Sequence, residues 1–519
     1  MQNISLIYPT GSAESKHLII GSEEQKILLG DLLYDRELDI AEFMTDDVKT
    51  LEYRQEIFAD MLAEPKITEL IREILPILES INELYRIRDN SHETEGQIYS
   101  VKLIELYIEF INTLYAQTRE FRHKVTSKSL LRFAEFVEET ACSDEFVNLC
   151  RNTYKLSRDV SRVKSITVGL NLDASFTPCE FGVLALNDEY IYQNDFMDRL
   201  TGKGNEKPLS SICPLRITSK VLSKEEKRFA EMALGSAINR LLKNSIKDWE
   251  PAIKAFFRQK TKAFLPLIKE LKFLLFGAQV LSQLKDKNLP LTMPRIKGKT
   301  EKAFRAKGLY NPVIAMVKDK TICNTIEFDE NGRIFIITGP NSGGKTVFLS
   351  AVGICQIFAQ LGFLVPSKFA EISPVDRIFV CFTSKSSSKS HGRLEEECIQ
   401  IKGIFNTLTE YSLVLMDETF SGTGSFEGAH IAFDVLRGLA AYGCRAVFST
   451  HMHELVSMIC HINSSDKALS KVDTLTVDTD GGGNRTYKII RTHPDGKSYA
   501  KSISDKYGLT FEAILKEMK

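Results

Sequence analysis

The sequence lacks several features that would quickly assign a protein to a class. Lys and Arg number 67 and Asp and Glu 68, so no overall charge excess favours a polyanion. Any nucleic-acid contact must therefore use local basic surface. The ten cysteines form no CxxC pair and no close Cys/His cluster. Their scatter favours reduced, buried thiols in a cytosolic protein over a disulfide framework or a zinc site.

Long apolar segments are missing as well. The most apolar run, LKFLLFGAQVL (271–281), is too short to cross a bilayer. The first 16 residues have no basic segment followed by an apolar one, so they do not resemble a signal peptide. We therefore expect a cytoplasmic protein without a membrane partner.

Helical periodicity dominates from about residue 40 to residue 150. Apolar residues recur at intervals of three and four, first in 67–85 and again in 101–114. Such stripes predict helices that pack against one another. Near residue 165 the pattern changes to alternation with Gly, Asn, Asp and Pro, which predicts hairpin strands.

The second half of the chain begins with another helical pattern. Ser223 and Glu226 have the spacing of a capping box, and helical periodicity then extends to about Lys287. The proline-rich and basic stretch 288–312 predicts a linker and surface loop. From about 313, strand and helix patterns alternate, as in a parallel α/β sheet.

A glycine-rich loop lies between an apolar strand pattern and a helical pattern. It fits GxxxxGK[ST] and consists of Gly339, Pro340, Asn341, Ser342, Gly343, Gly344, Lys345 and Thr346. Glycines let the backbone turn tightly and aim its N–H groups at phosphate oxygens, beside the positive end of the following helix. Lys345 is expected to contact the β- and γ-phosphates and Thr346 to bind Mg²⁺.

Two later strand patterns end in groups suited to nucleotide hydrolysis. YSLVLMDE (411–418) places Asp417 and Glu418 at the end of an apolar strand. We expect Asp417 to hold the magnesium through water and Glu418 to orient or deprotonate the attacking water. RAVFSTH (445–451) ends at His451, a candidate sensor of the γ-phosphate.

Other motifs narrow the class of nucleotide hydrolase. Neither the LSGGQ of transporter ATPases nor the NKxD of GTPases is present, and no acceptor pocket for a metabolic kinase is evident. The sequence instead resembles the ATPase domain of the MutS family of DNA mismatch-repair proteins. The resemblance extends over roughly 313–510 and rests on TGPNSGGK (338–345), DETFSGTGSFEG (417–428), THMHEL (450–455), LGFLVPS (361–367), DRIF (376–379) and DGKSYAKSISDKYGL (495–509).

The resemblance implies a multidomain fold, with an all-α core and lever, a small β-containing clamp, and a C-terminal α/β P-loop (ABC-like) ATPase domain. The domains it implies are a helical core in 1–160, a clamp-like segment in 161–220, lever helices in 221–300, and a MutS-type ATPase with a dimerisation segment in 301–519. It also implies ATP and Mg²⁺ as cofactors, Ile322 beside the adenine, and a homodimer that binds mismatched, branched or otherwise structured DNA.

Three departures from the family pattern qualify that inference. The helical core begins within the first 50 residues, so we expect a shortened member without the N-terminal mismatch-reading domain and without a C-terminal Smr domain. The Phe-x-Glu tripeptides at 133–135 and 136–138 lie in a helical pattern and are predicted to be core. Thr321 stands where an aromatic residue commonly stacks on adenine. HGRLEEE (391–397) replaces a Ser/Thr-rich segment that touches the partner's ATP. Either Arg393 or the preceding serines and lysines make that contact, or the glutamates face solvent.

The polymer that the chain binds stays open at this stage. Local basic clusters occur at 258–262 and 295–307, and Lys203 and Lys207 lie near the expected clamp tip. They are candidates for phosphate contacts, or are ordinary solvated residues. A nucleotide-gated clamp on branched DNA or on ribosomes is the alternative to mismatch recognition.

Overall fold

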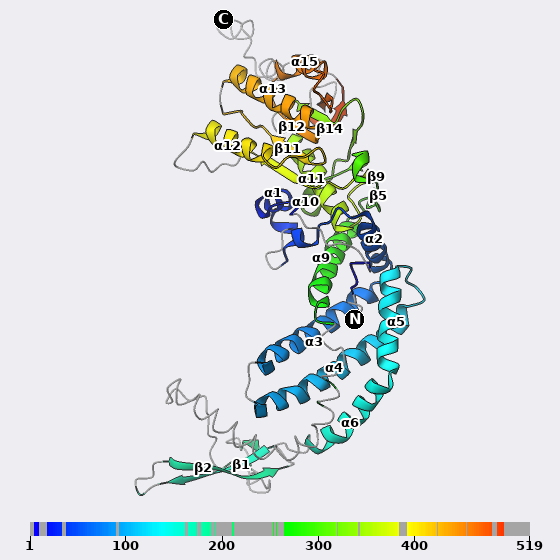
Figure 1. The fold of residues 1–519 in the computed structure, drawn as a ribbon, viewed down its shortest axis with the longest axis vertical. Coiled ribbons are helices and arrows are strands. Elements are labelled where there is room, and N and C mark those ends of the chain that lie inside the picture. The colour runs from blue at the N-terminus through cyan, green and yellow to red at the C-terminus, as the bar shows by residue number, and fades with distance from the viewer. Residues whose placement is uncertain are drawn as a thin grey trace, which may run out of the picture. The chain divides into compact units, whose positions relative to one another are not determined.

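The structure is a computed structural model, and its described residues fall into two compact units, which we call the helical unit and the sheet unit (Figure 1). The described residues are 5–9, 18–33, 38–89, 93–160, 165–172, 174, 178–187, 192–193, 210–211, 253, 256, 264–318, 320–340, 343–382, 392–422, 424–452, 454–479 and 485–492. The helical unit takes 1–4, 70–123 and 132–268, and the sheet unit takes 5–69, 124–131 and 269–519. The four-part division expected from the sequence stays a prediction.

Long helices build most of the helical unit. They are α3 (Lys66–Asp89), α4 (Glu93–Phe121), α5 (Lys128–Cys142) and α6 (Asp144–Val160). The predicted apolar stripes are buried, as Ile74 and Leu78 of α3 and Ile111 of α4 illustrate. Phe264 packs its ring 5.3 Å from that of Phe110 and 5.5 Å from that of Phe136. Phe133 is buried too, so the two phenylalanines of the Phe-x-Glu tripeptides pack in the helical unit, as predicted, whereas Glu135 is exposed.

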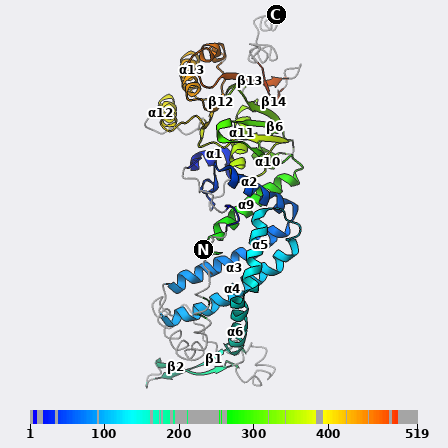
Figure 2. The same cartoon turned by 45° about the vertical axis from the view of Figure 1, so that its right-hand side comes forward.

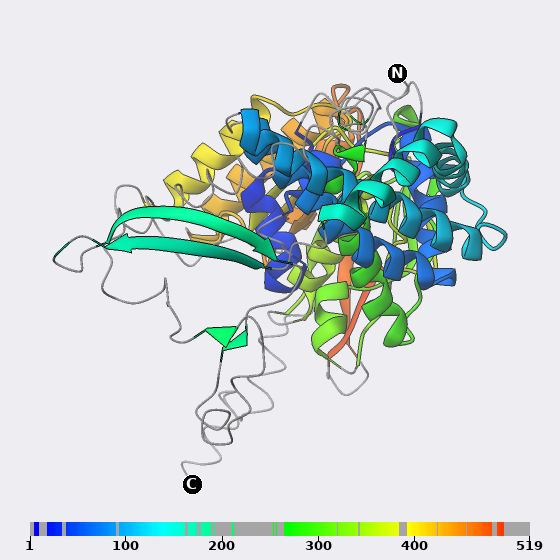
Figure 3. The same ribbon diagram turned by 90° about the horizontal axis from the view of Figure 1, so that it is seen from below.

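A β-hairpin follows these helices. Strands β1 (Ser165–Leu172) and β2 (Pro178–Asn187) pair antiparallel and are drawn as two long arrows (Figure 3). The Asn187 amide donates to the hydroxyls of Ser165 and Thr167 at 3.2 and 3.0 Å. The predicted hairpin is confirmed. The short strands β3 (Tyr192–Gln193) and β4 (Ser210–Ser211) pair in parallel. Lys203, Lys207, the basic residues of 258–262 and the helix start at Ser223 lie outside the described residues.

Six strands form the main sheet of the sheet unit, in the order β10-β11-β12-β8-β13-β14. All adjacent pairs are parallel except β13 and β14. The strands are β8 (Ile334–Thr338), β10 (Ile378–Phe382), β11 (Leu413–Asp417), β12 (Arg445–Ser449), β13 (Val472–Thr479) and β14 (Arg485–Arg491). Every residue of β8, β11 and β12 is buried, and their interiors are apolar, as expected for strands whose two faces are both covered by helices.

Helices cover the two faces of this sheet (Figure 2). On one face, Val414 and Met416 pack in a cluster with residues of α12 (Arg393–Phe405) and α13 (Ser425–Tyr442). Alternate residues point the other way, and Leu415 lies against Gly353 of α11 (Lys345–Leu361). The alternation of side chains along each strand therefore divides the core into two layers.

A second, four-stranded sheet corrects one sequence prediction. Its order is β5-β9-β6-β7, with β5 (Arg295–Ile296), β6 (Phe304–Leu309), β7 (Asn324–Phe328) and β9 (Phe369–Ile372). The prediction of a linker and surface loop over 288–312 was therefore wrong for 295–296 and 304–309, which are strands. In β6, Phe304 and Ala306 are buried, whereas Lys307 is exposed. The basic residues that indicated a loop alternate with apolar residues that face the core.

The N-terminal segment of the sheet unit packs against α2 (Val48–Ala63) and α9 (Leu267–Asp286) of the same unit. Arg54 in α2 is fully buried, and its guanidinium donates to the carbonyls of Ile7, at 3.1 Å, and Phe43. Burial lowers the pKa of Arg54, and stacking against the Tyr8 ring at 4.8 Å covers its face. The Glu270 carboxylate in α9 accepts the N–H of Leu6 at 2.7 Å.

The N-terminal part also contacts the six-stranded sheet. The carbonyl of Ile19 accepts the N–H of Ile378 at 2.8 Å, on the edge strand β10. In α1 (Ser22–Leu33), Leu28 lies where a side chain on Gly353 of α11 would otherwise fit. Residues 19–33 therefore belong to the packing of the α/β part.

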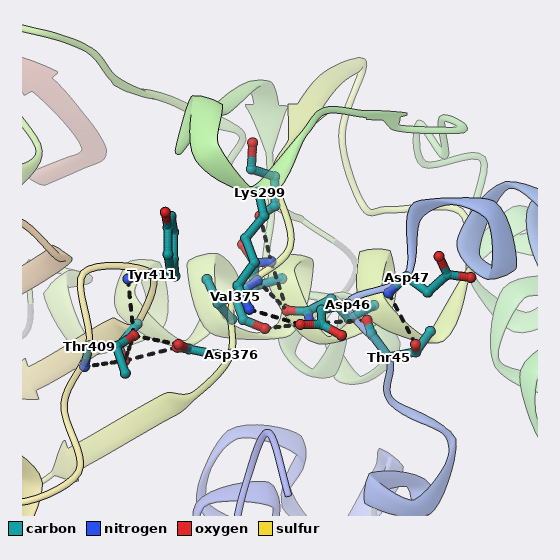
Figure 4. A network of polar contacts seen from close by, with 12 residues as sticks. Thr45, Asp46, Asp47, Lys299, Val375, Asp376, Thr409 and Tyr411 are labelled. Carbon is teal, nitrogen blue, oxygen red and sulfur yellow. Dashed lines mark hydrogen bonds and ion pairs between the residues drawn. The ribbon is translucent and has the colours of Figure 1, made fainter. Parts of the chain in front are cut away.

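Polar contacts join three distant segments around Asp46 (Figure 4). Lys299 forms an ion pair with Asp46 at 2.8 Å. The Gln360 amide donates to the carbonyls of Thr45 and Val375 at 3.1 and 2.8 Å. Of the basic residues at 295–307, Lys299 is thus engaged within the fold. Lys302 is also engaged, pairing with Glu410 at 2.6 Å.

Two further predictions concern membrane-spanning helices and cysteine thiols. Within the described ranges, no helix combines the length and apolarity needed to cross a bilayer. The described cysteines are free, in agreement with the absence of a disulfide framework. The prediction that they are buried was only partly right, because Cys142, Cys398 and Cys460 are exposed.

The end of α11 provides a test of the packing between α2 and α11. Gly362 has φ +81°, and a Cβ there would lie 2.4 Å from Cβ of Arg54. We expect Gly362→Ala to reduce the free energy of unfolding by about 2–4 kcal/mol, combining left-handed strain with overpacking. Gly403→Ala is the control, because that helical glycine faces open space. Gly403→Ala should raise the free energy of unfolding by about 0.5–1 kcal/mol. Urea unfolding followed by circular dichroism would measure the stability of both variants. If Gly362→Ala were as stable as Gly403→Ala, the packing of Gly362 against Arg54 described here would be contradicted.

Candidate nucleotide site

The glycine-rich loop lies between β8 and α11, as the sequence predicted. Gly339 has φ +140° and Gly344 has φ +92°, both in the region that favours glycine. A Cβ on Gly339 would lie 2.7 Å from the side chain of Val477, and one on Gly343 would lie 2.8 Å from the carbonyl of Pro340. Side chains are therefore excluded at these positions. Asn341 and Ser342 lie outside the described residues.

Lys345 begins α11 and points back over the loop. Its side chain is 4% exposed, and its ammonium donates to the carbonyls of Gly339 and Pro340 at 3.0 and 3.2 Å. The Glu418 carboxylate lies 3.8 Å away. Burial lowers the pKa of Lys345, and the charges of Glu418 and Asp417 oppose that shift. Two carbonyls of the loop thus bind the Lys345 ammonium near the end of β8.

Asp417 joins three elements at the carboxyl ends of the parallel strands. This carboxylate at the end of β11 is buried and accepts a hydrogen bond from the Thr346 hydroxyl of α11 at 2.5 Å. It also accepts one from the Ser449 hydroxyl of β12. Sequence reasoning missed Ser449, although a serine at the end of the apolar run RAVFS was a usable signal.

These oxygen donors fit a magnesium ion. Thr346 offers a hydroxyl and Asp417 a carboxylate, the hard ligands that Mg²⁺ prefers. Within the described residues, no group of three or more His, Cys, Asp or Glu side chains could hold a metal. A site with few protein ligands suits Mg²⁺, which keeps several waters and binds substrate phosphates.

Glu418 has an unusual backbone conformation. It is a non-glycine residue with φ +51°, and its N–H donates to the carbonyl of Ser449 at 2.9 Å. Its side chain is 32% exposed and faces the cavity beside Lys345. Left-handed backbone at a non-glycine residue persists only where neighbouring contacts hold it.

His451 follows β12, where Thr450 donates its N–H to the carbonyl of Ile337 in β8 at 3.0 Å. The imidazole is exposed, and His451 is not among the described residues that line the cavity. Its role as a γ-phosphate sensor stays a prediction. His453 lies outside the described residues.

A cavity of about 720 Å³ opens beside the loop. Its lining includes Gly343, Gly344, Lys345, Thr346, Glu418, Tyr310, Asn311, Lys318, Lys320, Thr321, Ile322 and Tyr487. Ile322 thus lines the same cavity as four residues of the glycine-rich loop, which are Gly343, Gly344, Lys345 and Thr346. Sequence reasoning missed its two tyrosines. The Tyr310 hydroxyl is buried without a hydrogen-bond partner in the described part of the chain, and burial raises its pKa. Tyr487 is 45% exposed and has φ +58°.

Comparisons with known proteins agree with this geometry. The family model described as MutS domain V matches residues 335–516, which include the glycine-rich loop, Asp417 and His451. The family model described as MutS2 N-terminal domain matches residues 46–287.

Relatives of two kinds match the chain. A DNA mismatch repair protein MutS of Prochlorococcus marinus (strain MIT 9301) is 30% identical over 308 residues, covering 58% of this chain and 32% of that protein. An Endonuclease MutS2 of Alkaliphilus oremlandii (strain OhILAs) is 32% identical over 213 residues, 41% of this chain and 26% of that protein. The matches to these relatives thus span about a quarter to a third of the relatives' lengths. The glycine-rich loop, the carboxylate pair at the end of β11 and the two family models together lead to one conclusion: the chain belongs to the MutS family.

Proposed function

We propose that the chain binds and hydrolyses ATP with Mg²⁺ and uses this cycle to switch a homodimeric clamp on mismatched or otherwise structured DNA. Amides of the loop 339–344 and Lys345 bind the phosphates, and Ile322 lies beside the base. Thr346 and Asp417 hold the metal. Glu418 serves the attacking water, and His451 senses the γ-phosphate.

The hydrogen bond between Thr346 and Asp417 is the observation that carries this proposal. It joins residues 71 positions apart, one at the start of α11 and one at the end of β11. The buried ammonium of Lys345 lies next to both elements. A hydroxyl, a carboxylate and a lysine that meet beside a glycine-rich loop match the needs of a metal-bound triphosphate.

Each residue then has a distinct chemical task. When bound, Mg²⁺ neutralises phosphate charge and orients the terminal phosphoryl group. Lys345 exchanges its loop carbonyls for phosphate oxygens, because an ammonium binds anionic oxygen more strongly than neutral carbonyl oxygen. Glu418 is partly exposed to the cavity, so it can accept a proton from a water beside the γ-phosphate.

The DNA-binding part of the proposal rests on the family. One set of matching relatives is named as DNA mismatch repair proteins and another as endonuclease MutS2. Residues 46–287 match the MutS2 N-terminal domain. We keep, as the alternative proposal, a nucleotide-gated clamp on branched DNA or on ribosomes. We keep the four-part division into core, clamp, lever and ATPase as part of this proposal.

The chemistry is tested by Glu418→Ala. Without the carboxylate, water activation is lost while the phosphate contacts remain. We expect hydrolysis to fall by about 10²–10⁴-fold, with the affinity for ATP retained. Glu330→Ala, at an exposed position of the sheet unit, should hydrolyse ATP normally. Steady-state hydrolysis and binding of a fluorescent ATP analogue measure both effects. Unchanged turnover in Glu418→Ala would remove this residue from the mechanism.

Ser449→Ala tests the metal site. Its hydroxyl donates to Asp417, so its loss leaves that carboxylate less firmly oriented. We expect the Mg²⁺ concentration for half-maximal hydrolysis to rise by about 10–100-fold. The exposed Ser457 provides a control, and Ser457→Ala should keep the wild-type metal dependence. An unshifted Mg²⁺ titration in Ser449→Ala would show that Asp417 is not the ligand.

The polymer can be identified with the Glu418→Ala protein held in its ATP-bound state. We expect tighter binding to mismatched or branched duplexes than to a perfect duplex, with affinity that falls as salt rises because phosphate contacts release counterions. Electrophoretic mobility shifts at several salt concentrations measure this. Cosedimentation with ribosomes, together with equal affinity for all duplexes, would favour the alternative.

A further inference from the structure

The glutamates at the start of α12 (395–397) include one whose contacts the sequence did not predict. Solvent exposure was one expectation for these glutamates, and for Glu397 that expectation was wrong. The Glu397 side chain is only 11% exposed. It lies against the loop that follows β11, the loop whose first residue is Glu418.

Glu397 binds this loop through its backbone. One carboxylate oxygen accepts the N–H of Phe420 at 2.7 Å, and the other accepts a hydrogen bond from Nε of Arg393 at 3.2 Å. Arg393 in turn donates from Nη2 to the hydroxyl of Ser421 at 3.3 Å. Two side chains one helical turn apart on α12 therefore hold two consecutive residues of the loop.

The loop needs such anchors because its backbone is strained. Both Glu418 and Phe420 are non-glycine residues with positive φ, +51° and +66°. Such conformations persist where surrounding contacts enforce them. The Phe420 ring is buried in the same apolar cluster that Leu394 of α12 packs against. A charged acceptor for the Phe420 N–H stabilises the turn more than a neutral one would.

Glu418 is thus held from both sides. Its own N–H donates to Ser449 of β12, and two residues later the Phe420 N–H donates to Glu397. Between them, the Thr419 hydroxyl donates to the carbonyl of Cys381 in β10 at 3.4 Å. A displacement at Phe420 is transmitted to Glu418 because only one residue separates them.

We propose that Glu397 is a positioning residue for hydrolysis: by accepting the Phe420 N–H, it fixes the turn that aims Glu418 at the attacking water. This inference rests on the proposed role of Glu418. It assigns to α12 control over the orientation of the base, while nucleotide binding depends on the loop 339–344 and α11. Loss of Glu397 should therefore affect turnover and leave ATP affinity intact.

The experiment compares Glu397→Ala, Glu397→Gln and Lys402→Ala in the full chain. Alanine leaves the buried Phe420 N–H without its acceptor. We expect kcat to fall by about 10–100-fold, because small misplacements of reacting groups have effects of that size. The KM for ATP should stay within about twofold. Glutamine keeps an oxygen within reach and should restore kcat to within about threefold of the wild type. Lys402 is exposed on the same helix and serves as the control.

A double-mutant cycle separates positioning from general destabilisation. In the Glu418→Ala background, Glu397→Ala should change the residual rate by less than about twofold, because the group that it positions is already absent. A purely structural residue would lower the rate in both backgrounds. If Glu397→Ala does not fold, as judged by thermal melting, Glu397→Asp replaces it, since the shorter side chain withdraws the acceptor but keeps the charge.

The outcomes distinguish this inference from the proposed function. Wild-type kcat in Glu397→Ala, or in Glu397→Asp where it replaces Glu397→Ala, together with inactive Glu418→Ala, would overturn the positioning role alone. Full activity in Glu418→Ala would overturn the role of the base and, with it, that of Glu397. Equal losses of kcat in the single and double backgrounds would assign Glu397 to stability only.

Discussion

The contact between the Thr346 hydroxyl and the Asp417 carboxylate is the constraint that the arrangement of the sheet unit has to meet. It requires β8, β11 and β12 to end at the same level, which their parallel register provides. It requires α11 to begin directly after a loop of glycines with positive φ. The buried strands, the two helical layers and the N-terminal segments that pack on α11 all serve to keep these two oxygen atoms adjacent.

The positions of the glycine-rich loop and the carboxylate pair were predictable because the motif restricts residue type and spacing together. Glycines, a lysine and a threonine in fixed order, followed by an apolar strand that ends in Asp417 and Glu418, leave few alternative structures. The hairpin and the helical stripes were predictable from periodicity alone. Strand β6 was not, because Arg305 and Lys307 hid the alternation of Phe304 and Ala306.

Ser449, Tyr310, Tyr487 and Glu397 illustrate what sequence reasoning could not supply. Each takes its role from the element that lies opposite it, and that element is distant in the chain. Glu397 meets Phe420 only because α12 packs beside the loop after β11. A glutamate in an acidic run gives no sign of which neighbour turns inward, since the choice depends on tertiary packing.

The hydrogen bond from the Ile378 N–H to the Ile19 carbonyl has a consequence for biosynthesis. An exposed edge strand of a β-sheet can pair with other chains. Here residues 18–20 cover part of the edge strand β10. The ribosome synthesises residues 18–20 hundreds of residues before β10, the strand that they cover. This part of the β10 edge is therefore covered only after residues 18–20 and 378–382 have both been synthesised.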